Sequence, residues 1–372
     1  MAQWFEENVT FMMTENETST DLLPFSTLMD GYPTVRRDYD GVVAHWKWFP
    51  MQWTWWNILQ LLSAILGIFG NLLVMLVLYS RRKVRRSTDT LIGALAFADF
   101  LTSVFLVPHP QIDTLPSDGW LSQVYCRVIH SSLVLWIAVV ASVFSLTAIS
   151  VDRYLAIAYP FFFMKHVNSS RTSICILIIW VAAFATNSFQ IVVGFAAENT
   201  CVVAFPSQKA QYTIGLFVFM IEFVVPITVM ISTQTMTAII LHRQSFRFQE
   251  GSSVNDRSNA NHIAARKRVV SMLLLVTTVF IFCWGPDQTF FLMVNLGLLD
   301  ISFLYGPLHR SLVVLAFMNS CANVFIYTIR YPKFRRAICD MFRSDSKTLV
   351  PLFGEVTNPK DQKRLTASSS NV

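Results

Sequence analysis

The stretch that decides the fold runs from residue 126 to residue 160 and reads CRVIHSSLVLWIAVVASVFSLTAISVDRYLAIAYP. Between Val128 and Val151 no residue is charged, and this run exceeds the roughly 20 residues that a helix needs to cross a bilayer core. Asp152 and Arg153 follow at its far end, where charged side chains can reach the membrane–water boundary. The stretch therefore predicts a membrane helix whose far end is either a simple boundary or a switch.

The composition of the whole chain favours a membrane protein. Of its 372 residues, 53% are apolar and 14% are charged, whereas a soluble protein carries about 25% charged residues. The net charge of +6 lies in short basic blocks between apolar runs, which argues against a nucleic-acid partner. Six scattered cysteines without a CxxC pair argue against a disulfide scaffold or a zinc site.

Seven apolar runs predict an all-α membrane protein, a bundle of seven transmembrane helices. They cover residues 55–79, 89–108, 125–157, 172–195, 211–241, 269–295 and 304–329. Lys and Arg concentrate after the first, third, fifth and seventh runs, so the positive-inside rule puts the N-terminus outside and the C-terminus inside. We expect the polar connection 243–268 to be flexible.

The chain divides into four predicted parts. These are an extracellular segment (1–52), the seven-helix bundle (53–330), a short amphipathic helix 8 on the inner membrane face (331–342) and a disordered cytoplasmic tail (343–372). Asn8 and Asn16 begin N-glycosylation triplets in the outer segment. Cys339, at the end of helix 8, is either palmitoylated or an unmodified buried thiol.

Each of the seven runs also carries a motif. In chain order these are Gly70-Asn71, Leu95-Ala96-Phe97-Ala98-Asp99, Asp152-Arg153-Tyr154, Trp180, Pro226, Cys283-Trp284-Gly285-Pro286 and Asn319-Ser320-Cys321-Ala322-Asn323-Val324-Phe325-Ile326-Tyr327. The ordered set resembles the rhodopsin-like (class A) G-protein-coupled receptors. The resemblance implies a plasma-membrane receptor, not an enzyme, that passes ligand binding to a heterotrimeric G protein. It also implies arrestin recruitment after tail phosphorylation and contacts with membrane lipids.

The same resemblance implies roles for residues in the inner half of the bundle. Asp152 would pair with Arg153 at rest, and release of Arg153 would open a cleft for a G-protein tail. The other implied switch residues are Tyr154, Val143, Pro226, Phe280, Trp284, Asn323 and Tyr327.

Asp99 is the acidic residue in the interior of the second run, which begins at Asp89, so it should face the bundle interior and a partner. The resemblance implies an allosteric sodium ion held by Asp99, Ser142, Asn319 and Asn323. The alternative is a structural carboxyl group bonded to Asn71 and Asn323, and both interpretations can hold together.

The chain also departs from the pattern of the family. Val324 stands where the seventh helix usually has proline, and Gln234 stands where a tyrosine usually stabilises the active state. Cys126 lies two residues further from Arg153 than is usual, which predicts a longer outer end of the third helix. Cys126 and Cys201 are the cysteines predicted outside, so we expect a disulfide between them.

The ligand class is open between a peptide and a small molecule, amine or lipid. The third helix has Leu133 or Leu135 where amine receptors have an aspartate, which favours a peptide ligand. The chain resembles neuropeptide receptors, including orphan invertebrate ones. Asp287 either contacts a cationic group of the ligand or pairs internally with Arg310. The candidate ligand-binding residues are Gln111, Leu135, Trp136, Gln190, Glu222, Trp284, Asp287, Gln288, Phe291, His309 and Arg310.

Other protein classes fit the sequence less well. A transporter or channel could use Asp99 and Glu222 on an ion path, but internal repeats and broken helices are not evident. A membrane enzyme would need a nucleophile or metal motif, and HExxH and GxSxG are absent.

Overall fold

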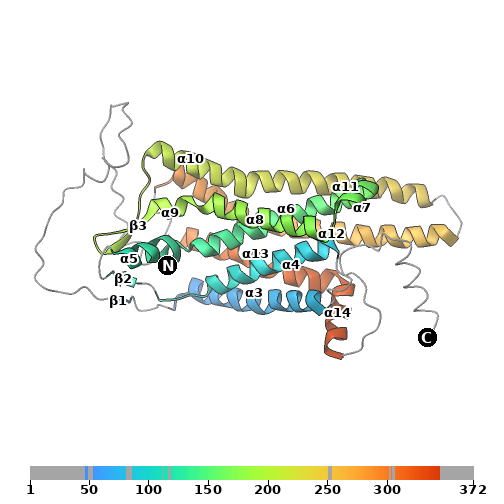
Figure 1. Cartoon of the computed structure of the whole chain (residues 1–372), viewed down its shortest axis with the longest axis horizontal. Coiled ribbons are helices and arrows are strands. Elements are labelled where there is room, and N and C mark those ends of the chain that lie inside the picture. The colour runs from blue at the N-terminus through green and yellow to red at the C-terminus, as the bar shows by residue number, and fades with distance from the viewer. Residues whose placement is uncertain are drawn as a thin grey trace, which may run out of the picture.

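The bundle architecture is defined by a computed structural model that describes residues 47–48, 53–80, 86–110, 112–115, 119–249, 254–300, 303 and 306–343. Within those ranges, seven helical segments are long and apolar enough to cross a membrane. They are Trp55–Ser80, Ser87–Leu106, Trp120–Ala158, Ser169–Val193, Gln208–Phe246, Lys267–Asn295 and Pro307–Arg330. The segments lie side by side along one long axis (Figure 1), and the predicted seven-helix bundle is confirmed.

Three spans are single helices, and three others are composed of shorter pieces. The first, second and seventh spans are α3 (Trp55–Ser80), α4 (Ser87–Leu106) and α13 (Pro307–Arg330). The third span joins α5 (Trp120–Val124), the π-helix η2 (Tyr125–His130) and α6 (Leu133–Ala158). The fourth joins α8 (Ser169–Asn187) and α9 (Phe189–Val193), and the fifth joins α10 (Gln208–Phe219), the π-helix η3 (Met220–Val224) and α11 (Val225–Gln249).

The prediction that the connection 243–268 is flexible was wrong for most of its length. Helix α11 continues to Gln249, and the sixth helix, α12 (Val254–Asn295), already begins before the membrane span. Polar residues are compatible with a helix, glycine and proline are the residues that disfavour it most, and this connection contains Gly251 but no proline. The polar composition of the segment therefore did not exclude a helix.

A β-hairpin covers one end of the bundle. Strands β3 (Gly194–Ala197) and β4 (Thr200–Val203) pair antiparallel across Glu198 and Asn199, whose positive φ angles of 50° and 60° suit a tight two-residue turn. The predicted disulfide is confirmed, because Cys126 of η2 is bonded to Cys201 of β4. A second strand pair, β1 (Lys47–Trp48) with β2 (Ile112–Thr114), lies at the same end (Figure 1).

The outer end of the third span is interrupted and not simply longer. The π-helix η2 adds residues without adding a regular turn, and Ser132 then adopts a left-handed conformation with φ 56°. These two irregularities take up the extra residues between Cys126 and Arg153. The Cys126 disulfide and the Asp152-Arg153-Tyr154 motif therefore still lie at opposite ends of the third span.

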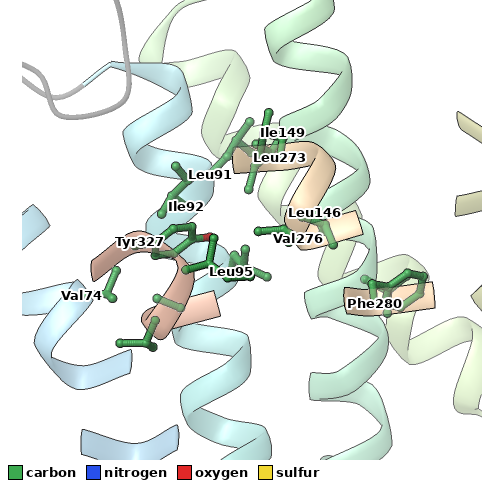
Figure 2. Packing of buried hydrophobic residues seen from close by; sticks show 14 of the residues in the cluster. Val74, Leu91, Ile92, Leu95, Leu146, Ile149, Leu273, Val276, Phe280 and Tyr327 are labelled. Carbon is green, nitrogen blue, oxygen red and sulfur yellow. The ribbon is translucent and has the colours of Figure 1, made fainter. Parts of the chain in front are cut away.

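The main cluster of buried apolar side chains lies between the helices and extends along the bundle, from Leu106 and Leu135 toward one end to Phe334 at the other. Figure 2 shows residues of five segments in one cluster, including Leu95 of α4, Leu146 of α6, Phe280 of α12 and Tyr327 of α13. Many large apolar side chains elsewhere are exposed, such as Phe69 and Leu177, as expected where hydrocarbon replaces water as the solvent.

Two short helices follow membrane spans. Helix α14 (Pro332–Arg343) turns across the end of the bundle (Figure 1) and buries Phe334 and Ala337, in agreement with the helix expected at 331–342. Cys339 in this helix is exposed, so the alternative of a buried thiol was wrong. Helix α7 (Pro160–His166), which the sequence did not reveal, follows α6 and buries none of its residues.

We predict that Ser132→Gly will be more stable than Ser132→Ala by about 1 kcal/mol, because only glycine tolerates a left-handed backbone without strain. Both variants lose the hydroxyl group, so their difference isolates the backbone. The measurement is the thermal midpoint of the purified protein in detergent. Equal midpoints, or a more stable alanine variant, would contradict the left-handed assignment.

Candidate functional site

A cluster of hydrogen bonds at the inner end of α6 centres on Asp152. Arg153 Nε and Nη2 donate to Asp152 Oδ2 over 3.1 and 2.7 Å. Ser87 Oγ and Thr88 Oγ1, at the start of α4, donate to the same carboxylate over 2.9 and 2.6 Å. The side chains of Asp152 and Arg153 are each only 7% exposed, so the pair is screened little by water.

This cluster therefore holds Arg153 and also ties α6 to α4. The sequence identified Asp152 and Arg153 but missed Ser87 and Thr88. Their position just before the second predicted span, directly after a basic block, was the available signal. Tyr154, the third residue of the motif, contacts Tyr159 with 6.0 Å between the ring centroids.

A second polar cluster lies near the middle of the bundle around Asp99. This fully buried carboxylate accepts from Ser142 Oγ of α6 over 2.7 Å and from Asn323 Nδ2 of α13 over 2.9 Å. Asn71 does not bond to it, contrary to the structural alternative, but donates to the carbonyl oxygens of Gly67 and Ser320. Asp99 thus joins α4, α6 and α13, and Asn71 separately joins α3 to α13.

Asn319 lies one helical turn before Asn323 on the same face of α13. Its Oδ1 atom is buried and has no hydrogen-bond partner among the described residues. Oxygen atoms of carboxylate, amide and hydroxyl groups, such as those of Asp99, Asn319 and Ser142, are the ligand type that small hard cations prefer. No group of three or more His, Cys, Asp or Glu side chains suited to a metal occurs in the described ranges.

Two prolines interrupt the helices that flank the core. Pro226 has no N–H to donate to the carbonyl of Glu222, and the π-helix η3 ends two residues before it, at Val224. Pro286 lies inside α12. Val143, Pro226 and Phe280 are all buried, and the Phe280 ring lies 6.1 Å from Phe223 between these two helices.

Three aromatic rings from three helices meet just outside the polar centre. Trp136 of α6, Trp284 of α12 and Phe317 of α13 have centroid separations of 6.1 to 6.4 Å. Trp136 and Trp284 were predicted ligand-binding residues. The sequence analysis missed Phe317, although an aromatic residue one turn before Cys321 on the buried face of α13 was a usable signal.

The outer half of the bundle contains buried carboxyl groups. Asp287 and Glu222 are 6% and 7% exposed, and Asp287 Oδ1 lies 3.8 Å from His309 Nε2. Neither Asp287 Oδ1 nor Gln288 Oε1 has a hydrogen-bond partner among the described residues. The His309 ring in turn stacks on Phe290 at 5.2 Å.

The internal pair between Asp287 and Arg310 is not formed. Arg310 instead lies over the Trp56 ring of α3, 4.4 Å from the ring centroid, and His309 is the neighbour of Asp287 in the described part of the chain. At 3.8 Å the imidazole lies too far from Asp287 Oδ1 for a full hydrogen bond. The site therefore holds a buried acid whose Oδ1 acceptor has no hydrogen-bond partner among the described residues.

The remaining predicted ligand-binding residues are more scattered. Gln190 donates to Asn187 over 3.0 Å, Leu135 is buried and Phe291 is half-buried. Gln111 lies outside the described residues, as do Asn8, Asn16 and the tail after Arg343.

Comparison with known proteins gives the family. Residues 70–327 match the family described as 7 transmembrane receptor (rhodopsin family). The substance-P receptor of Aquarana catesbeiana is 25% identical over 304 residues, which cover 79% of this chain and 72% of that receptor. Trace amine-associated receptor 7e of Mus musculus is 27% identical, covering 74% and 78%. The allatostatin-A receptor of Bombyx mori is 28% identical, covering 74% and 75%.

With seven apolar helices, the motif in each, and a family match over more than half of its length, the protein is a multi-pass membrane receptor. The chain belongs to the rhodopsin-like (class A) family of G-protein-coupled receptors, as its sequence motifs predicted. Members of this family are receptors and not enzymes.

Proposed function

We propose that this receptor binds an extracellular peptide in the outer half of its helix bundle and signals to a heterotrimeric G protein at the inner end. The ligand assignment rests on Asp287, whose buried Oδ1 atom has no hydrogen-bond partner among the described residues. A buried carboxylate with an unpartnered oxygen is costly unless a cation or donor completes it. A ligand with a guanidinium or ammonium group would supply both the positive charge and the hydrogen-bond donor.

Two of the relatives are neuropeptide receptors, and one is named for trace amines. Leu133 and Leu135 are buried apolar residues in the outer half of the third span, so an amine would lack an acidic partner there. This supports a peptide over an amine. A small molecule or a lipid is the second candidate, because the aromatic set of Trp136, Trp284 and Phe317 would also accept an apolar ligand.

The proposed orientation puts the β-hairpin end outside the cell. Disulfides persist in oxidising compartments, and Cys126–Cys201 lies at that end. The opposite end carries the basic connections, in keeping with the positive-inside rule. In the plasma membrane this orientation would expose the N-terminal segment, with Asn8 and Asn16, to the extracellular space.

At the inner end, the proposed signal is release of Arg153 from Asp152 followed by movement of α12. Arg153 would then be free to contact the tail of a G protein, and arrestin would follow once Ser and Thr of the tail are phosphorylated. Phe161 of α7 is 83% exposed near this end and offers an apolar contact to a cytoplasmic partner. The exposed Cys339 suits attachment of a palmitoyl chain that would fix α14 to membrane lipids.

We also propose a sodium ion beside Asp99. Asp99, Ser142, Asn319 and Asn323 would hold it, and its positive charge would compensate the buried carboxylate. The unsatisfied Asn319 Oδ1 supports this assignment, because a cation supplies the partner that this oxygen lacks.

Asp287→Asn should lower the potency of a cationic peptide by about ten-fold or more, because the charge-assisted contact is lost. The assay is a calcium, cAMP and arrestin screen against synthetic peptides that contain one Arg or Lys, each paired with a neutral citrulline or norleucine analogue. Glu198→Gln, at an exposed acid of the hairpin, is the matched control. If Asp287→Asn weakens the cationic and neutral peptides equally, the carboxylate has only a structural role.

Asp152→Asn should raise signalling without ligand several-fold, since the amide no longer holds Arg153 by charge. Arg153→Ala should abolish the response to any agonist at equal surface expression. Cyclic AMP and calcium are measured in cells, normalised to surface receptor. Unchanged basal signalling in Asp152→Asn would contradict a resting lock at this pair.

Sodium chloride should raise the thermal midpoint of the wild-type receptor above its value in potassium chloride at equal ionic strength, because a ligand that binds the folded state stabilises it. In Asp99→Ala this difference should disappear, whereas Asp287→Ala should keep it. A sodium effect of the same size in Asp99→Ala would rule out the proposed ion.

A further inference from the structure

One buried side chain joins three helices in the inner half of the bundle. Gln234 of α11 is 2% exposed, and its Nε2 atom donates to Ser150 Oγ of α6 over 3.0 Å and to Thr277 Oγ1 of α12 over 2.8 Å. The same atom lies 3.5 Å from the carbonyl oxygen of Leu273, also in α12. These contacts cross from one helix to each of its two neighbours.

The neighbouring groups fix the direction of these hydrogen bonds. Ser150 Oγ donates its hydrogen to the carbonyl of Leu146 over 3.2 Å, and Thr277 Oγ1 donates to Met230 Sδ over 3.7 Å. Because both hydroxyl hydrogens are already used, both oxygens can only accept from Gln234. The amide must therefore present its NH₂ group toward α6 and α12.

The surroundings of this amide exclude water. Ser150 and Thr277 are 1% and 3% exposed, and they directly follow Ile149 and Val276, whose side chains belong to the apolar cluster of Figure 2. Hydrogen bonds in such a dry environment are stronger than exposed ones. Any movement that separates α12 from α6 and α11 at this level must break them.

We infer that Gln234 is a latch that keeps the receptor in its resting state by holding α12 against α6 and α11. Ser150 precedes Arg153 by about one turn of α6, so the latch lies just outside the Asp152–Arg153 pair. While it is closed, α12 cannot move away from Arg153. The inference rests on the proposed function, in which that movement admits a G protein.

The latch is only partly satisfied, which limits its strength. Gln234 Oε1 is buried without a hydrogen-bond partner in the described ranges. In the closed state this orphaned acceptor costs free energy, and water that enters as α12 moves outward removes the cost. A ligand therefore has to supply less free energy than the two donated bonds alone would require.

This role differs from the one that the sequence suggested. There Gln234 was notable for replacing a tyrosine that usually stabilises the active state. The hydrogen bonds instead assign to Gln234 a contact that exists in the closed bundle and acts on both neighbouring helices. The residue is thus a positioning residue of the resting state and sets how much signalling occurs without ligand.

Two variants test the latch, each removing one side of it. Gln234→Met keeps the size of the side chain but removes the donor, and Thr277→Val removes one acceptor with nearly the same shape. Thr278→Val is the matched control, because the neighbouring Thr278 is exposed and bonds only within its own helix, to Leu274 O. Basal cAMP and calcium signalling are measured per receptor at the cell surface, with no ligand required.

Thr277→Val should raise basal signalling about three- to ten-fold, the effect of losing one net hydrogen bond from the resting state, while Thr278→Val should not change it. Gln234→Met should raise it by a similar factor, because it removes both donated bonds together with the orphaned Oε1. In the double variant Gln234→Met/Thr277→Val the increase should be less than the product of the single effects, because the two changes remove the same bond. A merely structural role would lower surface expression and thermal stability without raising signalling per receptor.

Asp152→Asn is run beside these variants to separate the two proposals. If Asp152→Asn raises basal signalling and Gln234→Met does not, the latch is wrong and the receptor mechanism stands. If neither does, the proposed mechanism of Arg153 release fails and the latch fails with it. Equal increases in Thr277→Val and Thr278→Val would also overturn the latch, since the exposed threonine cannot bond to Gln234.

Discussion

A polar group buried between these helices must find its partner inside the bundle, because hydrocarbon offers neither donors nor acceptors. This constraint explains why so many contacts between distant helices are polar although the core itself is apolar. Asp99 joins α4, α6 and α13, Asp152 joins α6 to α4, and Gln234 joins α11 to α6 and α12. The apolar cluster supplies contact area, and these few side chains determine which helix faces which. Asp287 is the exception, because its Oδ1 atom has no hydrogen-bond partner among the described residues.

The sequence was sufficient for the fold because its signals are long and local. Each of the seven apolar runs is long enough for a helix to cross the bilayer core. The motifs that contain Asp99, Arg153 and Pro286 identify the second, third and sixth helices of the family. The disulfide followed from the positions of Cys126 and Cys201 once the orientation had been predicted. The helical extensions on either side of residues 250–253 could not be predicted in this way, since a water-exposed helix and a loop share the same polar composition.

The candidate site was less accessible to prediction because its residues meet only in three dimensions. Asp287 and His309 belong to different helices, and the choice between His309 and Arg310 as the neighbour depends on a rotation of α13 that no local pattern encodes. Ser87, Thr88 and Phe317 were missed for the same reason. The consequence of replacing a tyrosine by Gln234 likewise required its two partners, Ser150 and Thr277, which come from separate helices.

The length of α12 has a mechanical consequence. It contains 42 residues, on the order of 63 Å at 1.5 Å per residue, which is about twice the thickness of the hydrocarbon core. Pro286 lies near its outer end, so the portion from Val254 to Pro286 forms a rigid arm of roughly 48 Å. A change of about 10° in the bend at Pro286 would displace the inner tip by about 8 Å while the rings around Trp284 hardly move. A small rearrangement near Pro286 would thereby produce a large displacement at the Val254 end of α12.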